Sequence, residues 1–317
     1  MIVVVYLPIA APWLIGSALG NRGLVRRCWR RWRGLPRTMP HPGLATWAIS
    51  ITCVACSLLS TWSLALLATA RIDRVAFVTE RLHLGATWLH TNHVPLGIAL
   101  TAAVYLGLRV MRCVDTIRRF AAERRSWSEI ATHVDGGLFV LDDPRPIVFT
   151  VGGHRPIIIA SQGLLDLLDN KQRQAVLAHE QAHITYKHWL HRLLVELAIA
   201  AEPLLRPARG AIHLQTERTA DEGAARTVGD RRPVLSAIRR LREARSAVAS
   251  QFLGHPTVWL HFYEDNDVDL RLDALAKSPA PPRLRSLGPY AAVMAAATFA
   301  SIDATQQLFH LLDHAMH

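Results

Sequence analysis

Cysteine and acidic residues are scarce in this chain. Four cysteines among 317 residues exclude the dense disulfide framework of small secreted proteins. Two residues separate Cys53 from Cys56, but the pair lies in an apolar run with no histidine or further cysteine nearby, so neither a disulfide nor a metal site is predicted there. Aspartate and glutamate number 25 against 36 lysines and arginines. The sequence also lacks internal repeats and long low-complexity segments.

Charged side chains are missing from several long segments. Hydrophobic residues make up 50% of the chain and the mean hydropathy is +0.16, which is high for a soluble enzyme. The first apolar segment has no basic region before it, so we interpret it as an anchor and not as a signal peptide. The sequence predicts four transmembrane helices, at residues 1–20, 42–70, 88–108 and 286–312.

The arginines are distributed unevenly around these spans. They fill residues 21–41 and recur from Arg109 onward, whereas residues 71–87 are less basic. By the positive-inside rule, residues 21–41 form a cytoplasmic loop, residues 71–87 an external loop and residues 109–285 a cytoplasmic domain. Since much of the net charge of +11 adjoins the lipid bilayer, we expect no direct nucleic-acid binding. The expected location is the cell membrane, with several passes.

The segment His179-Glu180-Gln181-Ala182-His183 has the spacing of a zinc hydrolase. Residues 170–178 before it contain no glycine or proline, and the helical pattern continues through Leu197. In a helix, His179 and His183 share one face and present two imidazoles to one metal, with Glu180 beside them to hold a water. The sequence therefore predicts a Zn²⁺ site with Glu180 as the catalytic residue.

A catalytic zinc needs a third protein ligand, and Glu217 is the best candidate. Residues 211–228 lack proline, and a helix there places Asp221 one turn beyond Glu217, where it would accept a hydrogen bond from a ligating histidine. Two alternatives stay open. The acidic residues of this helix are a solvated face, or His213, one turn before Glu217, is the ligand instead.

These motifs, together with the segment 151–165, resemble the membrane metallopeptidases typified by the BlaR and MecR signal transducers and, more distantly, HtpX and the CAAX prenyl proteases. The resemblance implies a mainly α membrane protein with four transmembrane helices and a cytoplasmic, gluzincin-like α+β zinc metallopeptidase domain. It assigns zinc binding to His179, His183 and Glu217, the general base to Glu180, and the orientation of a ligand to Asp221.

Three short β-branched runs, 137–141, 147–150 and 156–160, are separated by turn signals and predict a small antiparallel sheet. In similar metallopeptidases an edge strand of such a sheet receives the extended substrate. We assign this role to Val148, Phe149 and Thr150, with a purely structural hairpin as the alternative.

The chain departs from the resemblance at two points. Relatives often have an aspartate five residues after the second motif histidine, where this chain has His188. No penicillin-binding sensor domain is expected after the last span, so β-lactam sensing by that route is not expected. For the residue that stabilises the oxyanion, the candidates are His255, His261 and Arg271.

Three classes of function are compatible with these features. The first is a zinc endopeptidase that cleaves a cytoplasmic transcriptional repressor in a BlaR-like signalling pathway. The second is an HtpX-like protease for the quality control of membrane proteins. The third is a catalytically silent membrane scaffold, which the intact set of metal ligands and Glu180 disfavour.

Overall fold

The structure is a computed structural model that describes residues 41–69, 96–131, 137–153, 155–249 and 265–277, together with residue 295. The predicted spans at 1–20 and 286–312 lie outside the described residues, apart from residue 295. So do the predicted loop 71–87, the start of the predicted third span, and the oxyanion candidates His255 and His261.

The described chain is mostly helical, with one small sheet. Its helices are α3 (Pro42–Thr69), α5 (Leu96–Ala131), α6 (Gln162–Leu167), α7 (Asn170–Thr185), α8 (His188–Ala201), α9 (Ala208–Val228), α10 (Arg232–Ala249) and α11 (Asp265–Leu275), with a 3-10 turn, η3, at Pro203–Leu205. Its strands are β1 (Leu138–Leu141), β2 (Val148–Val151) and β3 (Ile157–Ser161).

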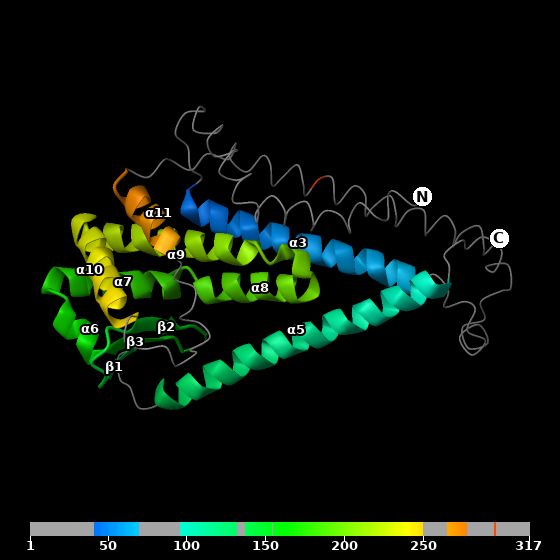
Figure 1. Cartoon of the computed structure of the whole chain (residues 1–317), viewed down its shortest axis with the longest axis horizontal. Coiled ribbons are helices and arrows are strands. Elements are labelled where there is room, and N and C mark those ends of the chain that lie inside the picture. Colours follow the sequence, from blue (N-terminus) through cyan, green and yellow to red (C-terminus); the bar gives the residue numbers. More distant parts are fainter. Residues whose placement is uncertain are drawn as a thin grey trace.

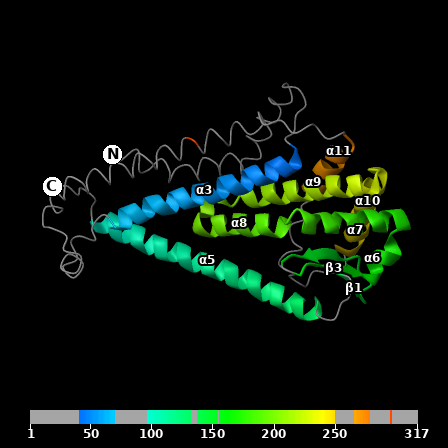
Figure 2. The same ribbon diagram turned by 180° about the vertical axis from the view of Figure 1, so that it is seen from behind.

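Two long helices, α7 and α8, run nearly end to end through the molecule, with α9 alongside them (Figures 1 and 2). α3 packs along α8 and α9, while α5 starts beside the C-terminal end of α3 and diverges toward the sheet. The sheet lies beside α7, on the side away from α9. This arrangement places α7 between the sheet and α9, where its residues contact both.

The sheet is mixed, so the prediction of an antiparallel sheet is wrong in one of its two pairings. The strand order is β1-β3-β2. β2 and β3 are antiparallel, but β1 runs parallel to β3. Burial accounts for the strand order: all five residues of Ile157–Ser161 are buried, so this most apolar strand takes the centre and the two half-exposed strands become edges.

The motif helix α7 begins where the sequence predicts and ends earlier. Asp169 and Gln172 form a reciprocal capping box that satisfies the first free amides of the helix. Helical structure does continue through Leu197 as predicted, but in a second helix, because Lys187 adopts the left-handed conformation (φ 50°) and separates α7 from α8. The break changes the direction in which His188 points.

α9 lies very close to α7, and a glycine permits this. A Cβ added to Gly223 would lie 2.9 Å from the Cβ of Ala182 and 3.2 Å from Cε2 of Tyr186. A larger side chain at position 223 would therefore push the two helices apart. Since α7 and α9 carry the metal-ligand candidates, their separation sets the distances at the site.

α3 and α5 are long and apolar enough to cross a membrane, over Pro42–Ala65 and Leu96–Trp127. Half of the apolar stretch of α3 is buried inside the protein, whereas α5 is mostly exposed. Arg109, expected at a membrane border, is instead buried: its Nη2 lies 2.5 Å from Glu202 Oε2 and 3.0 Å from Ser60 Oγ. This ion pair joins α5 to α3 and to the end of α8.

Candidate metal centre

Three side chains from α7 and α9 converge on one point. His179 Nε2 and His183 Nε2 are 3.1 Å apart, and the carboxylate oxygens of Glu217 lie 3.4 Å from the first and 3.5 Å from the second. A tetrahedral site with metal–ligand bonds of about 2.1 Å separates its ligand atoms by roughly 3.4 Å. The three residues therefore fit a tetrahedral metal ion such as Zn²⁺, with one position left for water.

Asp221 lies directly behind the first histidine. Its Oδ1 is 2.9 Å from His179 Nδ1, on the opposite side of the ring from the metal-facing Nε2. Arg271, from α11, holds the same carboxylate with two hydrogen bonds of 2.8 and 2.9 Å. Burial would raise the pKa of Asp221, but Arg271 and His179 keep it below its usual value. An ionised Asp221 fixes the ring of His179 with Nε2 free to bind a metal.

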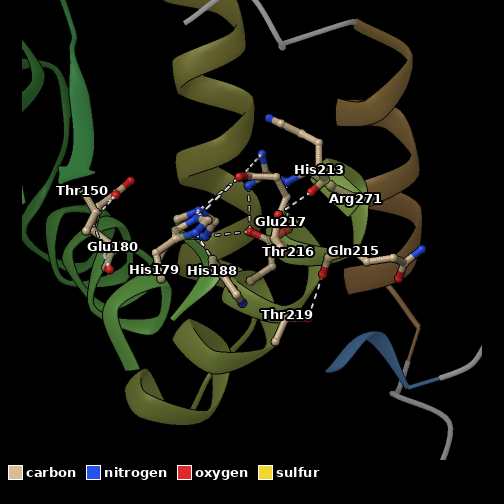
Figure 3. A network of polar contacts seen from close by, with 12 residues as sticks. Thr150, His179, Glu180, His188, His213, Gln215, Thr216, Glu217, Thr219 and Arg271 are labelled. Atoms are coloured by element: carbon tan, nitrogen blue, oxygen red, sulfur yellow. Dashed lines mark hydrogen bonds and ion pairs between the residues drawn. The ribbon is translucent and has the colours of Figure 1, made fainter. Parts of the chain in front are cut away.

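Glu180 lies beside the converging ligands on the same helix and is buried. Thr150, in β2, donates its hydroxyl hydrogen to Glu180 Oε2 at 2.7 Å, so the sheet fixes one oxygen of this carboxylate (Figure 3). Burial raises the pKa of Glu180, while the nearby His179 and the hydroxyl of Thr150 lower it. The effect of burial is the larger, so the pKa of Glu180 is raised, which suits a general base.

Two arginines neutralise the carboxylate of Glu217. Arg192 Nη2 is 2.8 Å from Oε1, and Arg271 Nη1 is 3.1 Å from Oε2. Burial would raise the pKa of Glu217, but Arg271 and the surrounding histidines hold it well below its usual range. Figure 3 shows Arg271 pointing at Glu217 next to His213. The carboxylate of Glu217 is therefore ionised.

The oxyanion candidate Arg271 is engaged behind the metal ligands. Its side chain is 5% exposed and contacts both Asp221 and Glu217. Arg192, on α8, is more accessible, with 29% of its side chain exposed, and it also lies at Glu217. Sequence reasoning did not identify Arg192, because only the break at Lys187 brings it to the site.

His188 and His213 are two further buried histidines close to the site. If α7 ran on unbroken, His188 would fall off the helix face of His179 and His183, but its Nδ1 is 2.8 Å from His183 Nδ1. The left-handed Lys187 accounts for the difference, since it turns the chain back toward His183. His213 is buried on α9, and burial lowers its pKa to about 4. It is not among the three described residues whose ligand atoms converge.

Val148, Phe149 and Thr150 form most of β2, an edge strand that runs beside α7. The amide of Ser161 donates to the carbonyl of Ile147, so this pair is hydrogen-bonded. In an antiparallel ladder such pairs alternate, which turns the amide and carbonyl of Phe149 toward β3 and those of Val148 and Thr150 away from it. The outward groups are on the strand that also contacts Glu180.

We expect Thr150→Val to reduce cleavage most strongly at acidic pH. The hydroxyl stabilises the ionised form of Glu180, so its removal raises the pKa of that carboxyl and moves the acidic limb of the pH profile of kcat/KM to higher pH. The loss at low pH should be about tenfold, the equivalent of one hydrogen bond to a charged group. Thr150→Ser is the matched control and should keep the wild-type profile. An unchanged profile for the valine variant would show that the hydroxyl does not act on Glu180.

Comparisons with known proteins agree with this geometry. Residues 137–255 match the model of peptidase family M48. A Protease HtpX homolog from Dictyoglomus thermophilum is 41% identical over 49 residues, which are 15% of this chain and 16% of the relative. The chloroplastic Plastoglobule-localized metallopeptidase 48 of Arabidopsis thaliana is 30% identical over 133 residues, which are 36% of this chain and 37% of the relative.

The chain therefore spans well under half the length of these two curated relatives. No solved structure matches significantly. The similarity supports the HtpX-like part of the predicted resemblance, and the specific assignment to the BlaR and MecR type stays a prediction. Residues 137–255, which contain every residue of the metal centre described above except Arg271, are similar to peptidase family M48.

Proposed function

We propose that this protein is a membrane-associated, zinc-dependent endopeptidase. The observation that carries the proposal is the convergence of His179, His183 and Glu217 at tetrahedral spacing, with Glu180 beside them and an edge strand next to it. The ligand set of two imidazoles and one carboxylate is that of catalytic zinc sites. The matched ranges of the relatives, both named as proteases or metallopeptidases, support the same activity.

The protein's own residues supply positioning and proton transfer. Zinc, when bound, supplies a Lewis acid that polarises the scissile carbonyl and acidifies a water. Glu180 accepts a proton from the attacking water and delivers one to the leaving amine. Asp221 keeps His179 in its metal-binding tautomer. We assign the stabilisation of negative charge on the carbonyl oxygen to Arg192, a partly exposed cation 2.8 Å from Glu217 Oε1.

The proposed substrate is an extended peptide that binds along β2. The outward amide and carbonyl groups of Val148 and Thr150 offer hydrogen bonds to a peptide backbone of almost any sequence. Because Thr150 also contacts Glu180, a peptide paired with this edge would run past the general base. The edge strand thus selects for extended segments and not for particular side chains.

Val148→Pro tests this mode of binding. Proline removes the outward amide without removing a bond to β3, because that amide points away from the sheet. We expect kcat/KM for an unstructured peptide to fall roughly three- to tenfold, the equivalent of one backbone hydrogen bond. Val148→Ala, which keeps the amide, is the control for the lost side chain. Equal activity of the two variants, with equal zinc content, would contradict substrate pairing along β2.

Two physiological substrates fit this activity, a cytoplasmic transcriptional repressor in a BlaR-like pathway and damaged membrane proteins as for an HtpX-like protease. The similarity to the Protease HtpX homolog favours the second. Comparing the proteomes of cells that carry the wild type or Glu180→Gln distinguishes them. Accumulation of one DNA-binding regulator in the variant cells supports the signalling role, and accumulation of many membrane proteins supports quality control.

We also propose that the protein is a multi-pass protein of the cell membrane with its peptidase domain in the cytoplasm. The exposed apolar residues of α5 support a place in the membrane, and the arginines around the predicted spans support this orientation. A reporter fused after Lys277 should be active only when it is of the cytoplasmic type. Activity of an external reporter at this position would reverse the orientation and exclude a cytoplasmic repressor as substrate.

A further inference from the structure

The second metal-ligand candidate, His183, is held by another histidine. His188 is the first residue of α8, and its Nδ1 lies 2.8 Å from His183 Nδ1. The other ring nitrogen of His183, Nε2, faces His179 and Glu217. His188 is 1% exposed, so water does not compete for this contact.

The position of the metal determines the direction of this hydrogen bond. A nitrogen that binds a metal offers its lone pair, so Nε2 of His183 carries no proton and the proton of the neutral ring is on Nδ1. That N–H donates to Nδ1 of His188, which must then be an unprotonated acceptor. We infer that His188 is a positioning residue, a neutral imidazole that fixes the tautomer and orientation of His183 for metal binding.

The two histidine ligands are thus supported differently. His179 donates to the ionised carboxylate of Asp221, which Arg271 holds in place, whereas His183 donates to an uncharged ring. A carboxylate partner makes a ligating imidazole more basic than a neutral partner does. We therefore expect His183 to be the weaker of the two histidine ligands. We also expect an aspartate at position 188 to strengthen metal binding.

A role in packing alone does not account for this residue. With its proton on Nε2, His188 carries a buried N–H that has no hydrogen-bond partner within the described part of the chain. Such a donor lowers stability, and an apolar ring of similar size would fill the space without it. A histidine at position 188 can accept the hydrogen bond from His183, and an apolar side chain cannot.

The test is zinc affinity, measured on the full chain in detergent by competition with a chelating dye. We expect His188→Phe to weaken zinc binding roughly 10- to 100-fold, the usual effect of losing such a partner. His188→Asn keeps an acceptor oxygen and should recover most of the affinity, and His188→Asp should bind zinc more tightly than the wild type. His191→Phe is the matched control, because this buried histidine of α8 bonds to Ser50 and not to a ligand.

A second readout does not depend on the phenylalanine variant folding. Nitrogen NMR of the zinc-loaded wild type, labelled at histidine, should show the proton of His183 on Nδ1 and that of His188 on Nε2. The inference would be overturned if His188→Phe bound zinc within about threefold of the wild-type affinity. It would also be overturned if the proton of His183 were on Nε2. The inference rests on the proposed metal site, so zinc binding by the wild type is measured first. No zinc binding by the wild type would refute the metal site itself. If the wild type binds zinc, the affinities of the position-188 variants test the role of His188 alone.

Discussion

Glu180→Gln should abolish peptide cleavage while the protein stays folded and keeps its metal. The amide has the size of the carboxylate and still accepts the hydrogen bond of Thr150 through its oxygen, but it takes no proton from water. Removal of a general base typically lowers the rate by a hundredfold or more. Cleavage of an unstructured protein substrate by the purified variant measures the loss, and metal content and thermal stability show that the site is intact.

A neighbouring residue provides the control for this experiment. Gln181 is the next residue of α7 and is exposed. Gln181→Glu replaces an amide with a carboxylate, the reverse of Glu180→Gln, at a position on the same helix outside the site. It should cleave at the wild-type rate. If Glu180→Gln were as active as Gln181→Glu, the metallopeptidase account would be wrong and a scaffold role would replace it.

Combining His183→Ala with Glu217→Ala should eliminate metal binding. Two of the three converging ligand atoms are lost, and the remaining imidazole holds zinc only weakly. Metal analysis should give about one zinc per wild-type chain and almost none for the double variant. Full zinc content in the double variant would place the metal elsewhere.

The double variant should also be less stable. Without Glu217, Arg192 loses its carboxylate partner and Arg271 keeps only that of Asp221, and a buried charge with fewer partners is costly. A control at a distance is Glu196→Gln, which weakens an ion pair with Arg209 on the same helices but leaves the site unchanged. This control should retain its zinc, which separates loss of the ligands from loss of a salt bridge.

The parts of the site that follow local rules were predictable from the sequence. The spacing of His179 and His183 on a helix, and of Glu217 and Asp221 on another, depends only on helical periodicity. The strand positions were also predictable from local sequence, since β-branched runs between turn signals mark them. What the sequence did not indicate was how separate elements meet, such as the parallel pairing of β1 with β3.

The supporting residues depend on long-range contacts. His188 and Arg192 reach the site only because Lys187 adopts a left-handed conformation, which no glycine or asparagine announces. Arg271 reaches Asp221 from α11, fifty residues along the chain. Arg109 follows an apolar run and reads as a membrane-border charge, yet its partner Glu202 is far away in sequence. Hydropathy and local periodicity carry no information about such pairings.

X-ray absorption at the zinc edge identifies the atoms around the metal in the purified full chain. We expect a site of two imidazole nitrogens and carboxylate or water oxygens at about 2.0 to 2.2 Å, with the same spectrum for Glu180→Gln. Sulfur ligands at about 2.3 Å, or a spectrum with fewer than two imidazoles, would contradict a metal centre built from His179, His183 and Glu217.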